Sequence, residues 1–145
     1  MNLPWYVTAI GAAVAWGIHY PLIDFAMKRI SIYGVLLLSV IPILILTPLF
    51  LRELANDVDV FKVLPTKEQW MILAIAVTST AGAVLIYFSI NSKNATLTSL
   101  IEITYPVFVI FFAYVLFRQV HVNLSVLIGG LLILSGSIII IYNNQ

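Results

Sequence analysis

Long apolar runs separated by short polar segments dominate the sequence. Five of these runs contain close to the 20 or so residues that a helix needs to cross the roughly 30 Å hydrocarbon core of a bilayer. They predict membrane-spanning helices at residues 4–26, 32–51, 70–90, 95–117 and 122–142. The second, third and fifth runs carry no charged side chain. We therefore expect an all-α integral membrane protein with five transmembrane helices, in a single domain over residues 1–145.

The segment 52–69 differs from the other connections because it carries seven of the thirteen charged residues of the chain. This concentration predicts a polar loop outside the bilayer. At its end, Thr66 and Gln69 have the spacing of a capping box, which marks the start of the third helix. The connections at 91–94 and 118–121 are short polar turns, so neighbouring helices should run antiparallel.

Composition supports a membrane location and excludes several kinds of chemistry. Charged residues make up 9% of the chain, compared with about 25% in typical soluble domains. We therefore expect a multi-pass protein of the cell (inner or plasma) membrane, with the lipid bilayer as its partner. The net charge of +1 suggests no nucleic acid, and the lack of Cys excludes disulfides and thiolate catalysis.

The basic residues of the connections give almost no orientation signal. Four lie on the side of the N-terminus and three on the other side, whereas an excess of Lys and Arg normally marks the cytoplasmic side. The two groups are Arg52, Lys62, Lys67 and Arg118, and Lys28, Arg29 and Lys93. Either one orientation holds and the balance is chance, or the chain inserts both ways and pairs head to tail.

Glu102 is the one acid within the fourth run. It lies about 10 Å from one membrane surface, as does His19 on the first run. An ionised Glu facing lipid is costly, and an ionisable residue inside a membrane is by default a functional hypothesis. Facing lipid is therefore discounted. Three states remain open: a protonated acid bonded to Ser99 or Tyr105, a pair with His19, and a carboxylate that binds a cationic ligand.

Other polar and aromatic residues share helix faces at spacings of three and four, which places them side by side. The alternative for each is ordinary helix packing, which is common for aromatic residues at this spacing. The candidate substrate- and proton-binding residues are Trp16, His19 and Tyr20 on the first run, Tyr87 and Asn91 on the third, and Glu102 and Tyr105 on the fourth.

Prolines and small residues complete the pattern. Pro21 and Pro106 each remove a helical hydrogen bond and predict kinks. On the last run, Ser125, Gly129 and Gly136 form a small-residue face, which predicts a packing or dimer seam. We find no metal-ligand pair, nucleophile–base set or phosphate loop, so neither an enzyme, a cofactor nor a metal is expected.

Two segments resemble a known family. "AVAWGIHYPLI" (13–23) resembles the Trp-Gly signature in the first helix of EamA-type carriers of the drug/metabolite transporter superfamily. The segment 94–141 is similar to the end of the repeat in these carriers, with "PVF" (106–108) in its fourth helix and Ile-Gly and Ser-Gly pairs in its last. One departure is Arg118-Gln119, where the family usually has a Glu.

The resemblance implies one five-helix repeat, a half-size member of the family. Full-length members carry two inverted repeats, so an antiparallel homodimer would rebuild the ten-helix carrier. It also implies that the first four helices line the path and that the fifth packs outside.

These observations together predict a membrane transporter of a small organic solute, either a metabolite or a cationic drug-like compound. It would work by alternating access as a homodimer, driven by proton exchange at Glu102 or by the gradient of the solute itself. Two alternatives remain: a flippase for lipid headgroups or lipid carriers, and a non-transporting membrane interaction subunit.

Overall fold

Helices make up nearly all of the described chain. The computed structural model describes residues 4–120 and 122–144, and no strand occurs in this part. The helices are α1 (Trp5–Met27), α2 (Ile32–Leu46), α3 (Leu51–Val63), α4 (Thr66–Ser92), α5 (Ala95–Glu102), α6 (Tyr105–Phe117) and α7 (Leu124–Asn143), and a short 3-10 helix, η1 (Thr47–Phe50), joins α2 to α3.

Five helical segments of the described residues are long and apolar enough to cross a membrane: Trp5–Met27, Ile32–Val63, Thr66–Ser92, Ala95–Phe117 and Leu124–Asn143. Many of their large apolar side chains are exposed, including those of Ile75, Val77 and Leu132. Continuous apolar surface of this kind marks a membrane or protein contact. The predicted fold class, an all-α membrane protein with five transmembrane helices, is confirmed.

Three helices begin at polar N-caps, which supply acceptors for backbone N–H groups that have no helical partner. The Ser31 side chain accepts from Gly34 N at the start of α2, at 3.3 Å. Asn94 and Asn123 act in the same way for α5 and α7. These caps explain why each new helix starts directly after a short polar turn.

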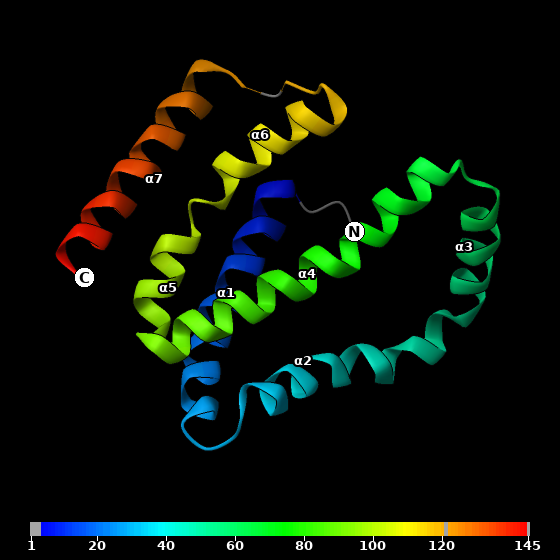
Figure 1. Cartoon of the computed structure of the whole chain (residues 1–145), viewed down its shortest axis with the longest axis horizontal. Coiled ribbons are helices and arrows are strands. Elements are labelled where there is room, and N and C mark those ends of the chain that lie inside the picture. The colour runs from blue at the N-terminus through cyan, green and yellow to red at the C-terminus, as the bar shows by residue number, and fades with distance from the viewer. Residues whose placement is uncertain (1–3, 121, 145) are drawn as a thin grey trace. The chain divides into compact units, whose positions relative to one another are not determined.

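The chain divides into two compact units, Met1–Pro21 with Lys93–Gln145, and Leu22–Ser92. The described part of the first unit holds the beginning of α1 together with α5, α6 and α7 (Figure 1). The second holds the end of α1 with α2, η1, α3 and α4. The boundary lies at Pro21, inside α1.

The fourth span is interrupted directly after Glu102, the last residue of α5. α5 ends there, Ile103 and Thr104 form a turn, and α6 begins at Tyr105 (Figure 1). Pro106 has no N–H, so it cannot donate to the Glu102 carbonyl four residues earlier. The segment expected as one helix, 95–117, is therefore two helices with their junction beside the intramembrane acid.

In the first unit, α7 packs against α5. Ser137 is buried, and its hydroxyl donates to the Leu100 carbonyl at 3.4 Å. Nearer the start of α7, a Cβ added to Gly130 would lie 3.8 Å from Val107 of α6, which is an ordinary van der Waals contact. The small residues that face this unit are therefore Gly130 and Ser137.

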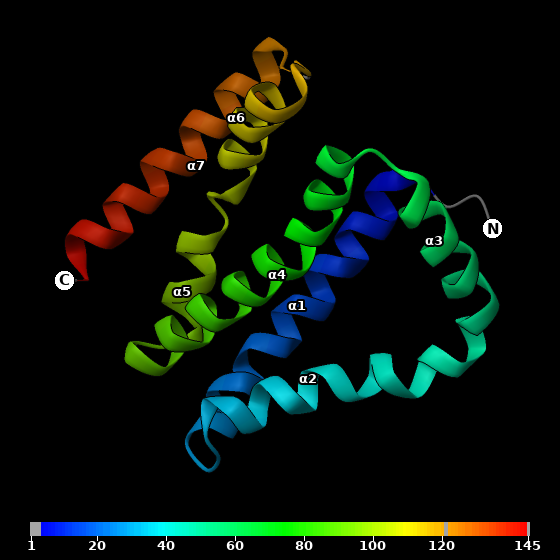
Figure 2. The same ribbon diagram turned by 45° about the vertical axis from the view of Figure 1, so that its right-hand side comes forward.

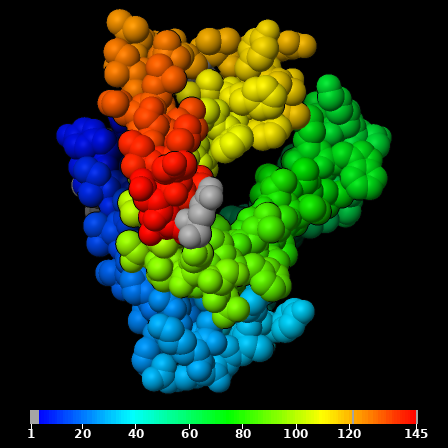
Figure 3. All heavy atoms as spheres, turned by 60° about the vertical axis from the view of Figure 1, so that its left-hand side comes forward, coloured from blue at the N-terminus to red at the C-terminus, as the bar shows by residue number. Residues whose placement is uncertain are grey.

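The predicted seam occupies a neighbouring stripe of α7. A Cβ at Gly129 or Gly136 would meet nothing within 4 Å, and Ser125 is exposed. Figure 3 views this helix from outside, with its side chains in orange to red. The seam at Ser125, Gly129 and Gly136 thus stays a prediction about a contact outside the packing of α7 on α5.

The second unit has a different plan. α2 and α4 are in contact, and the hydroxyls of Ser39 and Tyr87 lie 2.9 Å apart between them. α3 runs across the other ends of these two helices in both ribbon views (Figures 1 and 2).

Helix α3 differs from the loop expected over 52–69, because residues Leu51–Val63 are helical and α4 already begins at Thr66. The charged residues that suggested a solvated loop alternate with apolar ones at helical spacing. Charge density indicates that a segment lies outside the hydrocarbon core, but it does not distinguish a loop from an amphipathic helix. Only Leu64 and Pro65 separate α3 from α4.

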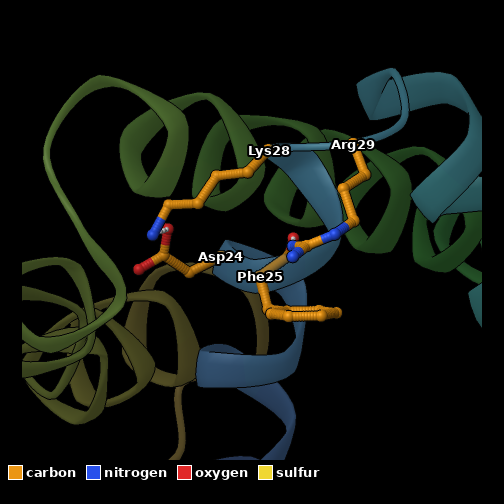
Figure 4. A network of polar contacts seen from close by, with 4 residues as sticks. All are labelled: Asp24, Phe25, Lys28 and Arg29. Carbon is orange, nitrogen blue, oxygen red and sulfur yellow. Dashed lines mark hydrogen bonds and ion pairs between the residues drawn. The ribbon is translucent and has the colours of Figure 1, made fainter.

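Two basic side chains, those of Lys28 and Arg29, lie at the C-terminal end of α1 (Figure 4). Arg29 Nη1 donates to the Phe25 carbonyl at 3.1 Å, and its guanidinium lies 3.7 Å from the centre of the Phe25 ring. Lys28 Nζ lies 3.2 Å from Asp24 Oδ1. Cations are favoured at a helix C-terminus by the helix dipole, so this end of α1 is suited to the membrane surface.

Replacing Pro106 with Ala should straighten the fourth span, because Ala can donate to the Glu102 carbonyl. Spin labels on cysteines at Thr96 and Leu116 would report the change in a chain that has no native Cys. We expect their separation to increase towards the roughly 30 Å of a continuous 20-residue helical span. Pro42→Ala, on α2, should leave it unchanged. An unchanged distance in Pro106→Ala would show that packing, rather than proline, sets the break.

Candidate functional site

A cleft of about 890 Å³ lies within the first unit. Its walls come from α1 and from α5 up to the junction with α6. Its lining residues are Ala9, Ala12, Ala13, Trp16, Gly17, Tyr20, Pro21, Ala95, Thr96, Ser99, Leu100, Glu102, Ile103 and Tyr105.

The α1 wall is made mostly of small side chains. Ala9, Ala13 and Gly17 follow each other at spacings of four, so they share one face. A Cβ built on Gly17 would have no neighbour within 4 Å, which leaves open space at this point of the wall. Small residues here create the volume of the cleft, and the larger Trp16 and Tyr20 also line it.

Glu102 is tied to the first helix. The Tyr20 hydroxyl donates a hydrogen bond to Glu102 Oε2, which lies 82 positions further along the sequence. Tyr20 is 7% exposed, and Glu102 is half-buried in the last turn of α5. The carboxyl group thus has a hydrogen-bond donor within the membrane-spanning region, where an unsatisfied polar group is expensive.

Of the partners left open by the sequence, Ser99 is engaged elsewhere. Its hydroxyl donates to the Thr96 carbonyl at 3.0 Å. Tyr105 lines the cleft and is 59% exposed. Tyr20, which was predicted as a lining residue, is the hydrogen-bond donor instead.

His19 lies in an aromatic group with Trp16 and Tyr20. The Trp16 and His19 rings meet edge to face with centroids 5.2 Å apart, and the Trp16 and Tyr20 centroids are 5.6 Å apart. Trp16 lines the cleft, whereas His19 does not belong to its lining. His19 therefore supports the aromatic wall from the side.

Both predicted kink residues affect backbone acceptors in this cleft. Pro21 removes the N–H that would pair with the Gly17 carbonyl, and Pro106 does the same for Glu102. Gly17 and Glu102 both line the cleft. Two backbone carbonyls of lining residues therefore lose their usual helical donors.

Tyr87 and Asn91 lie on α4, in the other unit. Tyr87 is 4% exposed and shares its hydroxyl hydrogen bond with Ser39, a partner that the sequence analysis did not identify. Asn91 is exposed. Trp16, Tyr20, Glu102 and Tyr105 are thus the predicted site residues that the structure brings together in one cleft.

The residues that sequence reasoning missed are the small ones. Ala9, Ala12, Ala13 and Gly17 carry no chemistry of their own, and their signal is only a repeated spacing of three and four on α1. Such stripes also occur wherever helices pack closely. Within the described residues, no group of three His, Cys, Asp or Glu side chains is placed to hold a metal ion.

Comparison with known protein families connects this arrangement to a function. The family model described as "EamA-like transporter family" matches residues 3–142, nearly the whole chain. The chain belongs to the EamA-like transporter family. The resemblance seen in the Trp-Gly segment and in the PVF segment is therefore confirmed.

Membership of the EamA-like family indicates a membrane transporter of small solutes. The family is one of transporters rather than enzymes, and with its five apolar helices this EamA-like chain is a multi-pass membrane protein in contact with the lipid bilayer. No curated protein and no solved structure matched the chain in the corresponding searches.

The Tyr20–Glu102 bond of this EamA-like protein should be measurable as a coupling energy. We expect Tyr20→Phe and Glu102→Gln each to lower the unfolding free energy in detergent micelles, because each weakens the same bond. Hydrogen bonds between membrane helices average about 0.6 kcal/mol and reach about 1.7 kcal/mol, so the double variant should lose less than the two single losses combined.

Tyr105→Phe serves as the matched control, since it removes a hydroxyl from the same cleft. Strict additivity of Tyr20→Phe and Glu102→Gln would contradict the bond.

Proposed function

We propose that this protein carries a small organic cation across the membrane by alternating access, and that Glu102 binds the cation or, in exchange for it, a proton. The observation that carries the proposal is the cleft in which one acid faces aromatic rings, with Tyr20 bonded to Glu102 and Trp16 and Tyr105 on the walls.

The chemistry of the cleft favours a cation over an anion or a neutral solute. A carboxylate attracts a cation directly, and aromatic faces attract it through their quadrupoles, most strongly when water is excluded. The carbonyls of Gly17 and Glu102 that proline deprives of helical donors add further acceptors. The described cleft lining contains no Lys or Arg that would suit an anion.

Proton coupling follows from competition for one group. Glu102 attracts a cation only as a charged carboxylate, and it loses that charge when it takes up a proton. The arrival of one therefore favours the release of the other. The Tyr20 hydroxyl stabilises the charged carboxylate when neither is bound, because hydrogen bonds to ionised groups are the stronger ones. The cycle therefore needs no other ionisable residue in the cleft.

The oligomer and the location belong to the same proposal. Five spans place the termini on opposite sides, and the near balance of basic residues allows both orientations, so we propose an antiparallel homodimer. The open faces of Gly129 and Gly136 on α7 support a contact beyond the unit. We place the protein in a plasma or inner membrane, since proteins built of apolar helices, rather than barrels, occupy such membranes.

Glu102→Gln should abolish the pH dependence of transport, because Gln cannot exchange a proton. Purified protein in liposomes would be given a pH gradient and a fluorescent quaternary ammonium dye. The wild type should accumulate the dye only with the gradient, and Glu102→Gln should lose this uptake. Glu68→Gln, on the exposed first turn of α4, is the matched acid control and should behave as wild type.

Tyr20→Phe keeps the acid but removes its hydrogen-bond donor, so it should weaken uptake without abolishing its dependence on the pH gradient. Unchanged pH-driven uptake in Glu102→Gln would eliminate the proton role. Dye-independent movement of a labelled phospholipid would instead favour a flippase.

Native mass spectrometry should give a species of twice the 16.1 kDa chain mass, and a C-terminal reporter should give signal from both sides of the membrane. Gln119→Lys adds one positive charge to the side that already carries four, so it should shift the reporter towards one orientation. A monomer, or a reporter confined to one side in the wild type, would refute the antiparallel pair.

A further inference from the structure

Helix α3 has two chemically different faces. Leu51, Leu54, Ala55, Val58 and Phe61 follow one another at spacings of three, one, three and three, which puts them on one side of the helix. Arg52, Glu53, Asn56, Asp57 and Asp59 lie on the remaining surface, which also carries Val60 and Val63. Leu51, Leu54 and Val58 are 60%, 43% and 52% exposed. An apolar face of this kind needs a covering partner.

The connections of α3 keep it at the membrane surface. The candidate span Ile32–Val63 consists of the apolar α2, η1 and the charged α3, and α4 forms the next candidate span. On the other side only Leu64 and Pro65 intervene before α4, and two extended residues reach about 7 Å at most. Neither end of α3 can move far from the lipid surface.

A side-chain clamp fixes the direction of α3. The Gln69 amide, on the first turn of α4, donates to the carbonyls of Phe61 and Leu64, both at 3.1 Å. These carbonyls lie at the C-terminal end of α3, where the last carbonyls of a helix lack their usual donors; the Phe61 carbonyl also accepts from Leu64 N at 3.3 Å. The clamp therefore ties the end of α3 to the start of α4, and α3 runs across the ends of α2 and α4 (Figure 2).

The charges of α3 indicate what kind of surface it meets. It carries Glu53, Asp57 and Asp59 against Arg52 and Lys62, so attraction to anionic headgroups would not hold it. Lys62 lies on the apolar face itself, four residues after Val58 and seven after Ala55, and its ammonium lies 3.0 Å from Asp59 Oδ1. A lysine in this position keeps its stem along apolar surface and its charge in water. The face is thus suited to the boundary between headgroups and acyl chains.

We propose that α3 is an interfacial helix that lies in the plane of the bilayer, with the face from Leu51 to Phe61 inserted at the level where headgroups meet acyl chains. Its partner is the lipid surface itself, regardless of headgroup charge. Because 13 helical residues extend about 20 Å, α3 also sets the spacing of α2 and α4 at this surface, while Ser39 and Tyr87 hold the same helices together further along.

Site-directed spin labelling tests this placement directly, since the chain has no native Cys. Single cysteines would be placed at Leu54 and Val58 on the apolar face and at Glu53 and Asn56 on the polar face. Protein in phosphatidylcholine vesicles would be exposed to oxygen, which concentrates in lipid, and to a water-soluble nickel chelate. We expect labels at Leu54 and Val58 to be relaxed severalfold more by oxygen than by nickel, and those at Glu53 and Asn56 to show the reverse.

Two results would overturn the proposal. Equal access of nickel to all four positions would mean that α3 projects into water. Protection of Leu54 and Val58 from both reagents would mean that protein, such as a second copy of the chain, covers the face. Vesicles containing phosphatidylglycerol should give the same pattern as phosphatidylcholine alone, and a pattern seen only with the anionic lipid would contradict an apolar contact.

Gln69→Ala tests the contribution of the clamp separately from that of the apolar face. Without the amide, α3 loses its fixed direction, so nickel access at Val58 should rise while the label at Glu53 stays water-exposed. Trp70→Phe, a substitution at the adjacent residue that leaves the clamp intact, is the control. These spectra do not require transport, so failure of the carrier mechanism and failure of the interfacial helix would be recognised separately.

Discussion

The need to satisfy every polar group inside lipid governs this structure. Helices meet this need along the spans, because each backbone N–H finds a carbonyl of the same helix. The need becomes acute where proline removes a donor or where a carboxyl group enters the core. Both occur at Glu102, whose side chain is bonded to Tyr20 and whose carbonyl has lost its usual donor to Pro106. The candidate site thus lies where a helical span cannot satisfy its own polar groups.

The two units solve the packing problem differently. In the first, small side chains on α1 leave the cleft open beside Glu102, where larger side chains would have packed against α5. In the second, α2 and α4 touch through a Ser39–Tyr87 pair, and α3 spans their far ends. The proposed surface helix thus belongs to one unit and the candidate cleft to the other, so the two proposed contacts, with lipid and with solute, would use different parts of the chain.

The sequence predicted the spans well because the length of an apolar run is a direct consequence of bilayer thickness. It also singled out Glu102, since an acid in such a run is conspicuous. It did not select Tyr20 over Ser99 or His19 as the partner, because that choice depends on how α1 and α5 meet in space. Nor did it find α3, whose charges resemble those of a loop, or the alanine and glycine wall, whose residues carry no distinctive chemistry.

The sequence distance between Tyr20 and Glu102 has a consequence for biogenesis. During synthesis at about 5–20 residues per second, the separation of 82 positions corresponds to roughly 4–16 s. Tyr20 is therefore synthesised several seconds before Glu102, so its phenol would be available when the acid emerges. The order of the helices along the chain would spare Glu102 a period of exposure to lipid, so the same bond that shapes the finished cleft would also guide its assembly at the translocon.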